Sequence, residues 1–259
     1  MRIRRWFRAL ACAVFTAVMA SATALGVVAA AGSPAGRAAW RDRMTQLWAR
    51  GLARILGLSI QLEGEPPPRG ALLVANHLSY LDIVLLAARI PCGFVAKAEV
   101  RSWPGIGLVC RVAGVVFVDR ARRRDAPRAA SEMHDALAQG RTVILFPEGT
   151  STDGRAVLPF RSALLDGAAR SGRPVWCAAV GYRTPVGAPP AESAVCWAGD
   201  DAFAPHVWGL LGLPRIEGAI RFAATPIIDG RRKELAQQLW DAVRREHLAL
   251  AEAWPAQDD

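Results

Sequence analysis

Short apolar runs, most of them followed closely by polar side chains, constrain this chain more than any other feature. Runs of four to eight apolar residues are typical of strands buried on both faces of a sheet. The strand-like runs are 71–75, 94–96, 115–118, 142–146, 174–180 and 219–224. Helical patterns lie among them at 82–89, 125–139 and 160–171, and a last one at 231–253. This alternation predicts an α/β domain with a mixed sheet flanked by helices.

A histidine and an aspartate follow the first central run. His77 and Asp82 are five residues apart, so on one continuous helix they would point about 140° apart. If His77 lies in a turn and Ser79 is the N-cap of a helix that includes Asp82, the carboxylate can reach the imidazole. A bond from Nδ1–H would leave Nε2 as a general base. Alternatively, His77 ends a strand and Asp82 is a first-turn charge that the helix dipole favours.

Two further strand ends carry polar groups. Phe146 is followed by Pro147-Glu148-Gly149-Thr150-Ser151, which provides a carboxylate, a flexible glycine and two hydroxyls. Val118 is followed by Asp119 and Arg120, and a guanidinium can bind a phosphate through two parallel hydrogen bonds. Ligands of open α/β sheets bind at the carboxyl ends of strands. The three clusters therefore predict one site.

In this order the clusters resemble the glycerolipid acyltransferases of the lysophosphatidic acid acyltransferase type. That family carries an NHxxxxD block, a G-x-x-F-x-D-R block and an FPEGT-S block. The matching residues are Asn76, His77 and Asp82, then Gly114, Phe117, Asp119 and Arg120, then Phe146 to Ser151. The resemblance spans about residues 70 to 180. A fourth block of the family, a strand with an internal proline, is matched only by Pro174 at the start of a run, so the acceptor-side wall departs from the pattern.

The resemblance implies transfer of a fatty acyl group from acyl-CoA or acyl carrier protein to the hydroxyl of a lysophospholipid. It implies 1-acyl-sn-glycerol-3-phosphate as acceptor and phosphatidic acid as product, with the thioester as co-substrate and no cofactor or metal. His77 is then the general base and Asp82 its partner. The acceptor-binding candidates are Lys97, Arg120, Glu148, Gly149, Thr150 and Arg161. Each basic side chain among them is otherwise a solvated surface charge.

Other functions remain open at this point. A related bacterial branch acylates a lyso-ornithine lipid, and the segments 160–165, 197–200 and 205–206 are similar to it. A membrane-associated thioesterase or hydrolase would need a serine nucleophile, but no Gly-x-Ser-x-Gly elbow is present. A non-catalytic membrane-binding module is the third alternative, and the intact His77, Asp82 and Glu148 argue against it.

The N-terminal region indicates a membrane. Four arginines among the first eight residues precede an uncharged stretch from Ala9 to Gly36, which as a helix would extend about 42 Å against a hydrocarbon thickness of roughly 30 Å. A cleaved secretory signal is the alternative, but it would separate the enzyme from cytoplasmic CoA and acyl carrier protein. Residues 37–55 then pattern as a basic amphipathic helix, which either lies in the membrane interface or packs on its own domain.

Charge and composition agree with a membrane partner. The chain has a net charge of +9 and is 52% apolar, and a basic surface suits nucleic acid or anionic lipid. The arginines at 120–128 have no interleaved aromatic residues, so nucleic acid is not expected. We predict N-terminal membrane helices at 1–58, an acyltransferase domain at 59–254 and a flexible tail at 255–259. The expected location is the bacterial inner membrane, with the catalytic domain on its cytoplasmic face.

Overall fold

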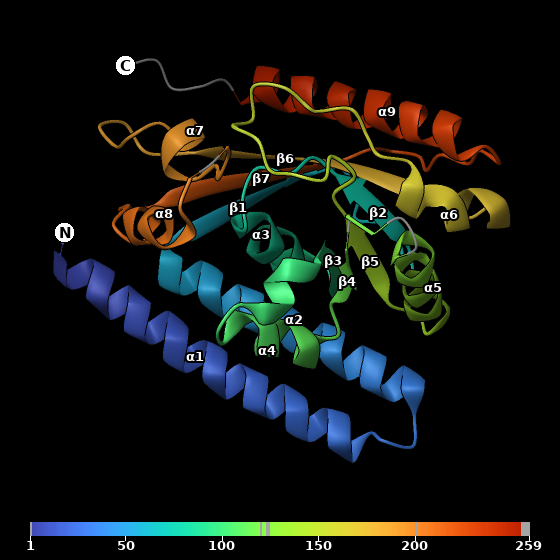
Figure 1. The fold of residues 1–259 in the computed structure, drawn as a ribbon. Coiled ribbons are helices and arrows are strands. Elements are labelled where there is room, and N and C mark those ends of the chain that lie inside the picture. The colour runs from blue at the N-terminus through green and yellow to red at the C-terminus, as the bar shows by residue number, and fades with distance from the viewer. Residues whose placement is uncertain (1, 120, 123–124, 200, 255–259) are drawn as a thin grey trace.

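A computed structural model describes residues 2–119, 121–122, 125–199 and 201–254 of the chain. Two long helices come first, and a seven-stranded sheet with helices on both faces follows (Figure 1). The helices are α1 (Arg2–Ala29), α2 (Pro34–Leu56), α3 (Leu81–Arg89), α4 (Ile106–Ala113), α5 (Asp125–Ala138), α6 (Asp166–Ser171), α7 (Ala191–Ala194), α8 (Phe203–Leu210) and α9 (Arg232–Ala253). The strands are β1 (Leu58–Glu63), β2 (Leu72–Ala75), β3 (Cys92–Lys97), β4 (Val116–Val118), β5 (Thr142–Leu145), β6 (Val175–Arg183) and β7 (Ile216–Phe222). Two 3₁₀ turns span Ala98–Ser102 and Ala163–Leu165.

The sheet is mixed, as the sequence predicts. Its strand order is β1-β7-β6-β2-β5-β3-β4, and among the strand pairs of the described residues β6–β7 alone is antiparallel. Strands β2, β5, β3 and β4 therefore run in one direction, and their carboxyl ends meet at one edge. That edge is where His77, Glu148 and Lys97 follow their strands.

Both faces of the sheet are covered, which explains why the central runs are continuously apolar. Leu73 and Ala75 of β2 pack with residues of α2 and α3, whereas Leu72 and Val74 pack with residues of α5 and α9. Figure 1 shows the two layers, with α9 on one side of the sheet and α3, α2 and α1 on the other. Because successive side chains of a strand point to opposite faces, a strand between two helical layers has no polar face.

The two N-terminal helices differ in how they are buried. Helix α2 buries Met44, Ala49 and Leu52 against the core, so the alternative of an amphipathic helix packed on its own domain is the one observed. Helix α1 packs on α2, where Trp48 Nε1 donates to Thr16 Oγ1 at 3.0 Å. Its other side exposes large apolar residues, and its most hydrophobic window has a mean hydropathy of 2.0 with only 6% of residues buried. By length and composition α1 is a candidate membrane helix.

A buried ion pair joins α2 to the far end of the sheet. Arg141 precedes β5 and donates from Nε to Asp42 Oδ1 of α2 at 2.7 Å, with both side chains almost fully buried. Its other nitrogens donate to the carbonyl oxygens of Gly114 and Ala113. The pair holds α2 and the turn after α4 against the strand that leads to Glu148.

Two local expectations are wrong. Residues 58–63 form β1 although they were not predicted as a strand, and they pair in parallel with β7. Helix α6 is shorter than the predicted 160–171, because residues 160–162 are irregular and 163–165 form a 3₁₀ turn. The pattern of apolar and polar residues at 160–165 is not regular enough to locate where the helix begins. The predicted tail, residues 255–259, lies outside the described residues.

Ser79 is not the cap of the helix after β2. Helix α3 begins at Leu81, its N-cap is Tyr80, and no side chain caps it. The hydroxyl of Ser79 is buried without a hydrogen-bond partner among the described residues. Asp82 takes the expected role instead, since its Oδ2 accepts the backbone N–H groups of Leu78 and Ser79. An aspartate in the first turn thus reaches back to amides that precede the helix, as the second residue of a capping box does.

Candidate active site

The candidate site is the turn between β2 and α3. Asn76 opens this turn and fixes it to the neighbouring strand β6: its Nδ2 donates to Val180 O at 3.0 Å, and its Oδ1 accepts Val180 N–H at 2.8 Å. The side chain is buried and both amide groups are satisfied. Asn76 therefore continues the sheet pairing by one residue beyond β2 and sets where His77 emerges.

His77 and Asp82 make the contact that the sequence predicts. The imidazole Nδ1 lies 2.7 Å from Asp82 Oδ2, and because an ionised carboxylate only accepts, Nδ1 carries the hydrogen. The ring also stacks on Phe146, with centroids 4.2 Å apart and planes 15° apart. The His77 side chain keeps 22% of its surface exposed, whereas Asp82 has none. Nε2, the accessible nitrogen, is thereby in the state that can accept a proton.

Asp82 receives hydrogen bonds on both oxygens. Oδ2 accepts from His77 and from two backbone N–H groups, those of Leu78 at 2.7 Å and Ser79 at 3.0 Å. Oδ1 accepts from the hydroxyl of Tyr182 in β6 at 2.8 Å. Burial, and then the neighbouring Asp82 charge, raise the pKa of Tyr182, so its hydroxyl stays protonated and remains a donor. The carboxylate is held from three directions, which fixes the imidazole that it contacts.

Glu148 binds the same histidine through the backbone. Its Oε1 accepts His77 N–H at 2.7 Å and its Oε2 accepts Leu158 N–H at 2.8 Å. The side chain is buried, and this burial raises the pKa of Glu148 to about 7, although both backbone bonds lower it. Glu148 thus links the β2–α3 turn to the loop after β5. In this arrangement its carboxylate oxygens point to the protein backbone.

The residues next to Glu148 complete that loop. Gly149 adopts φ of 80°, a left-handed conformation that glycine takes without strain, and its N–H donates to Phe146 O. Thr150 is exposed, and the Ser151 hydroxyl donates to Trp197 O. Thr152 N–H donates to His77 O at 2.9 Å. Gly149 and Thr150 therefore lie beside the histidine turn, as the sequence predicts.

Two predicted basic residues, Lys97 and Arg161, lie at or next to the same sheet edge. Lys97 ends β3, two strands from β2, and its side chain is exposed. Arg161 is also exposed, and its backbone N–H donates to Pro147 O at 2.9 Å, which puts it against the Glu148 loop. Neither forms an ion pair with a described residue. Arg120, after β4, lies outside the described part of the chain.

Sequence reasoning missed Tyr182 altogether. Residues 181–214 pattern as an irregular excursion, whereas β6 continues to Arg183 and places Tyr182 over Asp82. The chain has only two tyrosines, and both bond at this site: the Tyr80 hydroxyl lies 3.0 Å from His206 Nδ1. Nothing in the spacing of Tyr182 relative to the motif could have indicated the contact.

Comparison with known proteins agrees with this geometry. Residues 59–181 match the family model described as Acyltransferase. Over 207 residues the chain is 35% identical to a lyso-ornithine lipid O-acyltransferase of Pseudomonas aeruginosa, covering 79% of this chain and 78% of that one. The chain belongs to the acyltransferase family. This acyltransferase is also 35% identical to a 1-acyl-sn-glycerol-3-phosphate acyltransferase of Neisseria meningitidis, over 55% of its own length and 56% of the relative's.

The fold of the acyltransferase has a counterpart among solved structures. It is similar to the crystal structure of the 1-acyl-sn-glycerophosphate acyltransferase PlsC from Thermotoga maritima, with a TM-score of 0.66 and 22% identity. The match covers 96% of this chain and 99% of the other, so it includes the N-terminal helices. At that identity the likeness concerns the fold alone.

Proposed function

We propose that this acyltransferase transfers a fatty acyl group to the hydroxyl of a lyso-ornithine lipid, with His77 as general base. The observation that supports the base is the 2.7 Å contact between His77 Nδ1 and Asp82 Oδ2, which leaves Nε2 on the accessible side. An alcohol is a poor nucleophile at neutral pH and needs a base within hydrogen-bond reach. Nε2 takes the hydroxyl proton, and Asp82 stabilises the imidazolium that forms.

The remaining steps follow from thioester chemistry. The acceptor oxygen bonds to the carbonyl carbon of acyl-CoA or an acyl carrier protein thioester, and the tetrahedral oxyanion collapses as the carbon–sulfur bond breaks. The thiolate leaves and takes the proton from His77. A cysteine nucleophile is not required, and burial raises the pKa of Cys92, Cys110, Cys177 and Cys196. Those thiols stay protonated, which makes them poor nucleophiles.

The choice of acceptor rests on how much of this chain each group of relatives matches. Four lyso-ornithine lipid O-acyltransferases match 76–81% of this chain, whereas the two Neisseria 1-acyl-sn-glycerol-3-phosphate acyltransferases match 55% of it. The longer matches reach beyond the shared catalytic segment. The second candidate acceptor is 1-acyl-sn-glycerol-3-phosphate, and the exposed, unpaired side chains of Lys97 and Arg161 beside the Glu148 loop favour it among the described residues.

A membrane location fits either acceptor. Both are lipids, and α1 presents an exposed apolar side along its length. Because CoA and acyl carrier protein are cytoplasmic, the catalytic domain belongs on the cytoplasmic face of the inner membrane. Helix α1 packs along the basic helix α2, so a perpendicular crossing by α1 would draw the arginines of α2 into hydrocarbon. We therefore place α1 in one leaflet.

An acyl-transfer assay tests the proposal directly. The purified full chain is given lyso-ornithine lipid and 1-acyl-sn-glycerol-3-phosphate in parallel, each with acyl-CoA and with acyl carrier protein thioester. We expect faster acylation of the lyso-ornithine lipid, and loss of turnover for both acceptors in His77→Ala. Faster acylation of the phosphate acceptor, slowed by a higher KM in Arg120→Ala, would replace the first candidate with the second. Release of free fatty acid without either acceptor would indicate a thioesterase.

A further inference from the structure

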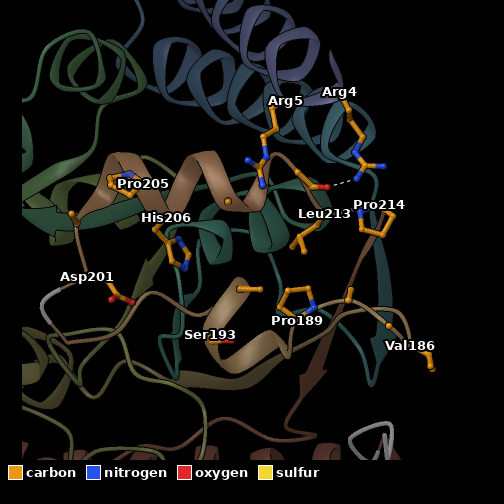
Figure 2. A pocket seen from close by; sticks show the side chains of 16 residues that line it. Arg4, Arg5, Val186, Pro189, Ser193, Asp201, Pro205, His206, Leu213 and Pro214 are labelled. Carbon is orange, nitrogen blue, oxygen red and sulfur yellow. Dashed lines mark hydrogen bonds between the residues drawn. The ribbon is translucent and has the colours of Figure 1, made fainter. Parts of the chain in front are cut away.

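A cavity separate from the histidine turn lies between the start of α1, helix α8 and the loop at 186–189 (Figure 2). Its volume is about 640 Å³. Arg4 and Arg5 line one end, and Asp201 and His206 line the other. Neither His77, Asp82 nor Glu148 lines it. The proposed acyl transfer thus gives this cavity no role.

The two arginines have unsatisfied donors. Arg4 donates to Gly212 O, but the Nε atoms of both Arg4 and Arg5 are buried without a partner among the described residues. Arg8, one turn further along α1, shows the opposite case: its guanidinium donates to Leu213 O at 2.6 Å and more weakly to Leu211 O and Pro214 O. A buried charged donor without an acceptor costs free energy, so an anionic ligand with oxygen acceptors would stabilise the arginine end of the cavity.

Protein groups do not supply that anion. Among the described lining residues Asp201 is the one carboxylate, and Figure 2 shows it at the opposite end from Arg4. Arg5 cannot withdraw toward α8, because it already lies against Gly212, where an added Cβ would be 2.5 Å from its Nε. Two neighbouring guanidinium groups with free N–H donors match the oxygens of a phosphate ester, which accept paired hydrogen bonds.

The surroundings indicate that the phosphate belongs to a lipid. Ile3, Trp6 and Phe7 flank the two arginines in sequence and expose 87%, 67% and 70% of their surfaces. Trp6 also contacts Trp208 of α8, with ring centroids 4.8 Å apart. A phospholipid bound here would place its head group between Arg4 and Arg5 and its acyl chains along the exposed apolar side of α1. We propose that this cavity is a binding site for the phosphate of an anionic membrane phospholipid.

The site is connected to the histidine turn through His206. Its Nε2 donates to Cys196 O at 2.9 Å, so its Nδ1 accepts from the Tyr80 hydroxyl. Tyr80 is the N-cap of α3, the helix that carries Asp82. A bound lipid would contact α8 beside Gly209, and the same helix carries the histidine that bonds to Tyr80. It would position the enzyme on the membrane without being the molecule that is acylated.

The test measures binding of the purified full chain to phosphatidylcholine vesicles with and without phosphatidylglycerol. Any arginine near an anionic surface adds general attraction, worth about fivefold in affinity per side chain. The matched control is Arg2→Gln, which removes an exposed charge from the same helix outside the cavity. We expect the affinity of the Arg4→Gln/Arg5→Gln variant for the anionic vesicles to fall by well over the roughly 25-fold that the loss of two such charges explains.

A second variant leaves the charges unchanged. Gly209 of α8 lines the cavity, and a Cβ there would meet no atom within 4 Å, so Gly209→Leu fills the space. Its control is Gly167→Leu, another helical glycine facing open space. We expect Gly209→Leu alone to weaken binding to the anionic vesicles. The proposal is overturned if the double variant loses no more than about 25-fold in affinity for the anionic vesicles, or if Gly209→Leu binds these vesicles as tightly as the wild type does.

Discussion

Asp82 and Glu148 are both buried carboxylates that bond to His77, yet they bond to different parts of it. Asp82 contacts the imidazole and is itself held by two backbone amides and the Tyr182 hydroxyl. Glu148 accepts hydrogen bonds from the backbone N–H groups of His77 and Leu158, and no side chain among the described residues donates to it. The comparison separates two tasks: Asp82 sets the chemistry of the ring, and Glu148 sets the position of the turn.

Replacing the histidine removes what both carboxylates support. In His77→Ala we expect kcat to fall by about 10²–10⁴-fold, the usual contribution of a positioned base. The fold should persist, because the ring is partly exposed and stacks only on Phe146. Single-turnover acyl transfer and circular dichroism, measured on the same preparation, check both statements. An active His77→Ala enzyme would remove the basis for assigning either carboxylate a role in turnover.

Asp82→Asn should lower kcat by about 10²-fold or more, because a neutral amide no longer stabilises the imidazolium that forms when Nε2 takes the hydroxyl proton. The matched control is Asp42→Asn, which alters another buried aspartate, one paired with Arg141 far from the histidine. We expect Asp42→Asn to lower the unfolding temperature and to leave the kcat of the folded fraction unchanged. Equal kcat losses in the two variants would mean that Asp82 acts only through stability.

Glu148→Gln should have its main effect on stability and a smaller one on kcat, about tenfold. The amide NH₂ of glutamine cannot accept an N–H, so one of the two backbone donors, on His77 or on Leu158, loses its acceptor.

The pH dependence of stability separates Glu148 from Asp82 further. Burial raises the pKa of Glu148 from 4.5 to about 7, so between these values the folded protein binds more protons at Glu148 than the unfolded chain does. The free energy of unfolding should therefore fall as pH rises from about 4.5 to 7, and the contribution should be constant above pH 7. Urea unfolding at several pH values should show this slope in the wild type and a reduced slope in Glu148→Gln. An unchanged slope would contradict the assignment.

Tyr182→Phe should lower kcat about as much as Glu148→Gln does. It removes one of the donors to Asp82, a loss of about 1–2 kcal/mol, which corresponds to roughly a five- to thirtyfold decrease in kcat if all of it is expressed in the transition state. KM should change little, because the bond that is lost joins the Tyr182 hydroxyl to Asp82. Tyr80→Phe is the matched control, since that hydroxyl bonds to His206 and not to Asp82. A shift in the pH–rate profile for Tyr182→Phe alone would identify it as a positioning residue.

The sequence predicted the central strands and the histidine turn because those features are local. A continuous apolar run is the pattern of a strand that is covered on both faces of its sheet. His77 and Asp82 are close enough in sequence for their contact to depend on a single turn. Tyr182 and Leu158 could not be predicted, because they reach Asp82 and Glu148 through the pairing of β6 with β2 and the path of the loop after β5. The strand β1 was missed for a similar reason: half of its residues are exposed, and it forms through its pairing with β7.

The contacts of Arg8 have a practical consequence for anyone who prepares this enzyme. Trimming an apolar N-terminal helix is a common way to obtain a water-soluble form of a membrane-associated protein. Here a chain shortened by residues 1–29 would leave the carbonyl oxygens of Leu211, Leu213 and Pro214 without the guanidinium that binds them. It would also uncover the side of α2 on which α1 packs. Detergent or nanodisc solubilisation of the full chain is therefore the better preparation.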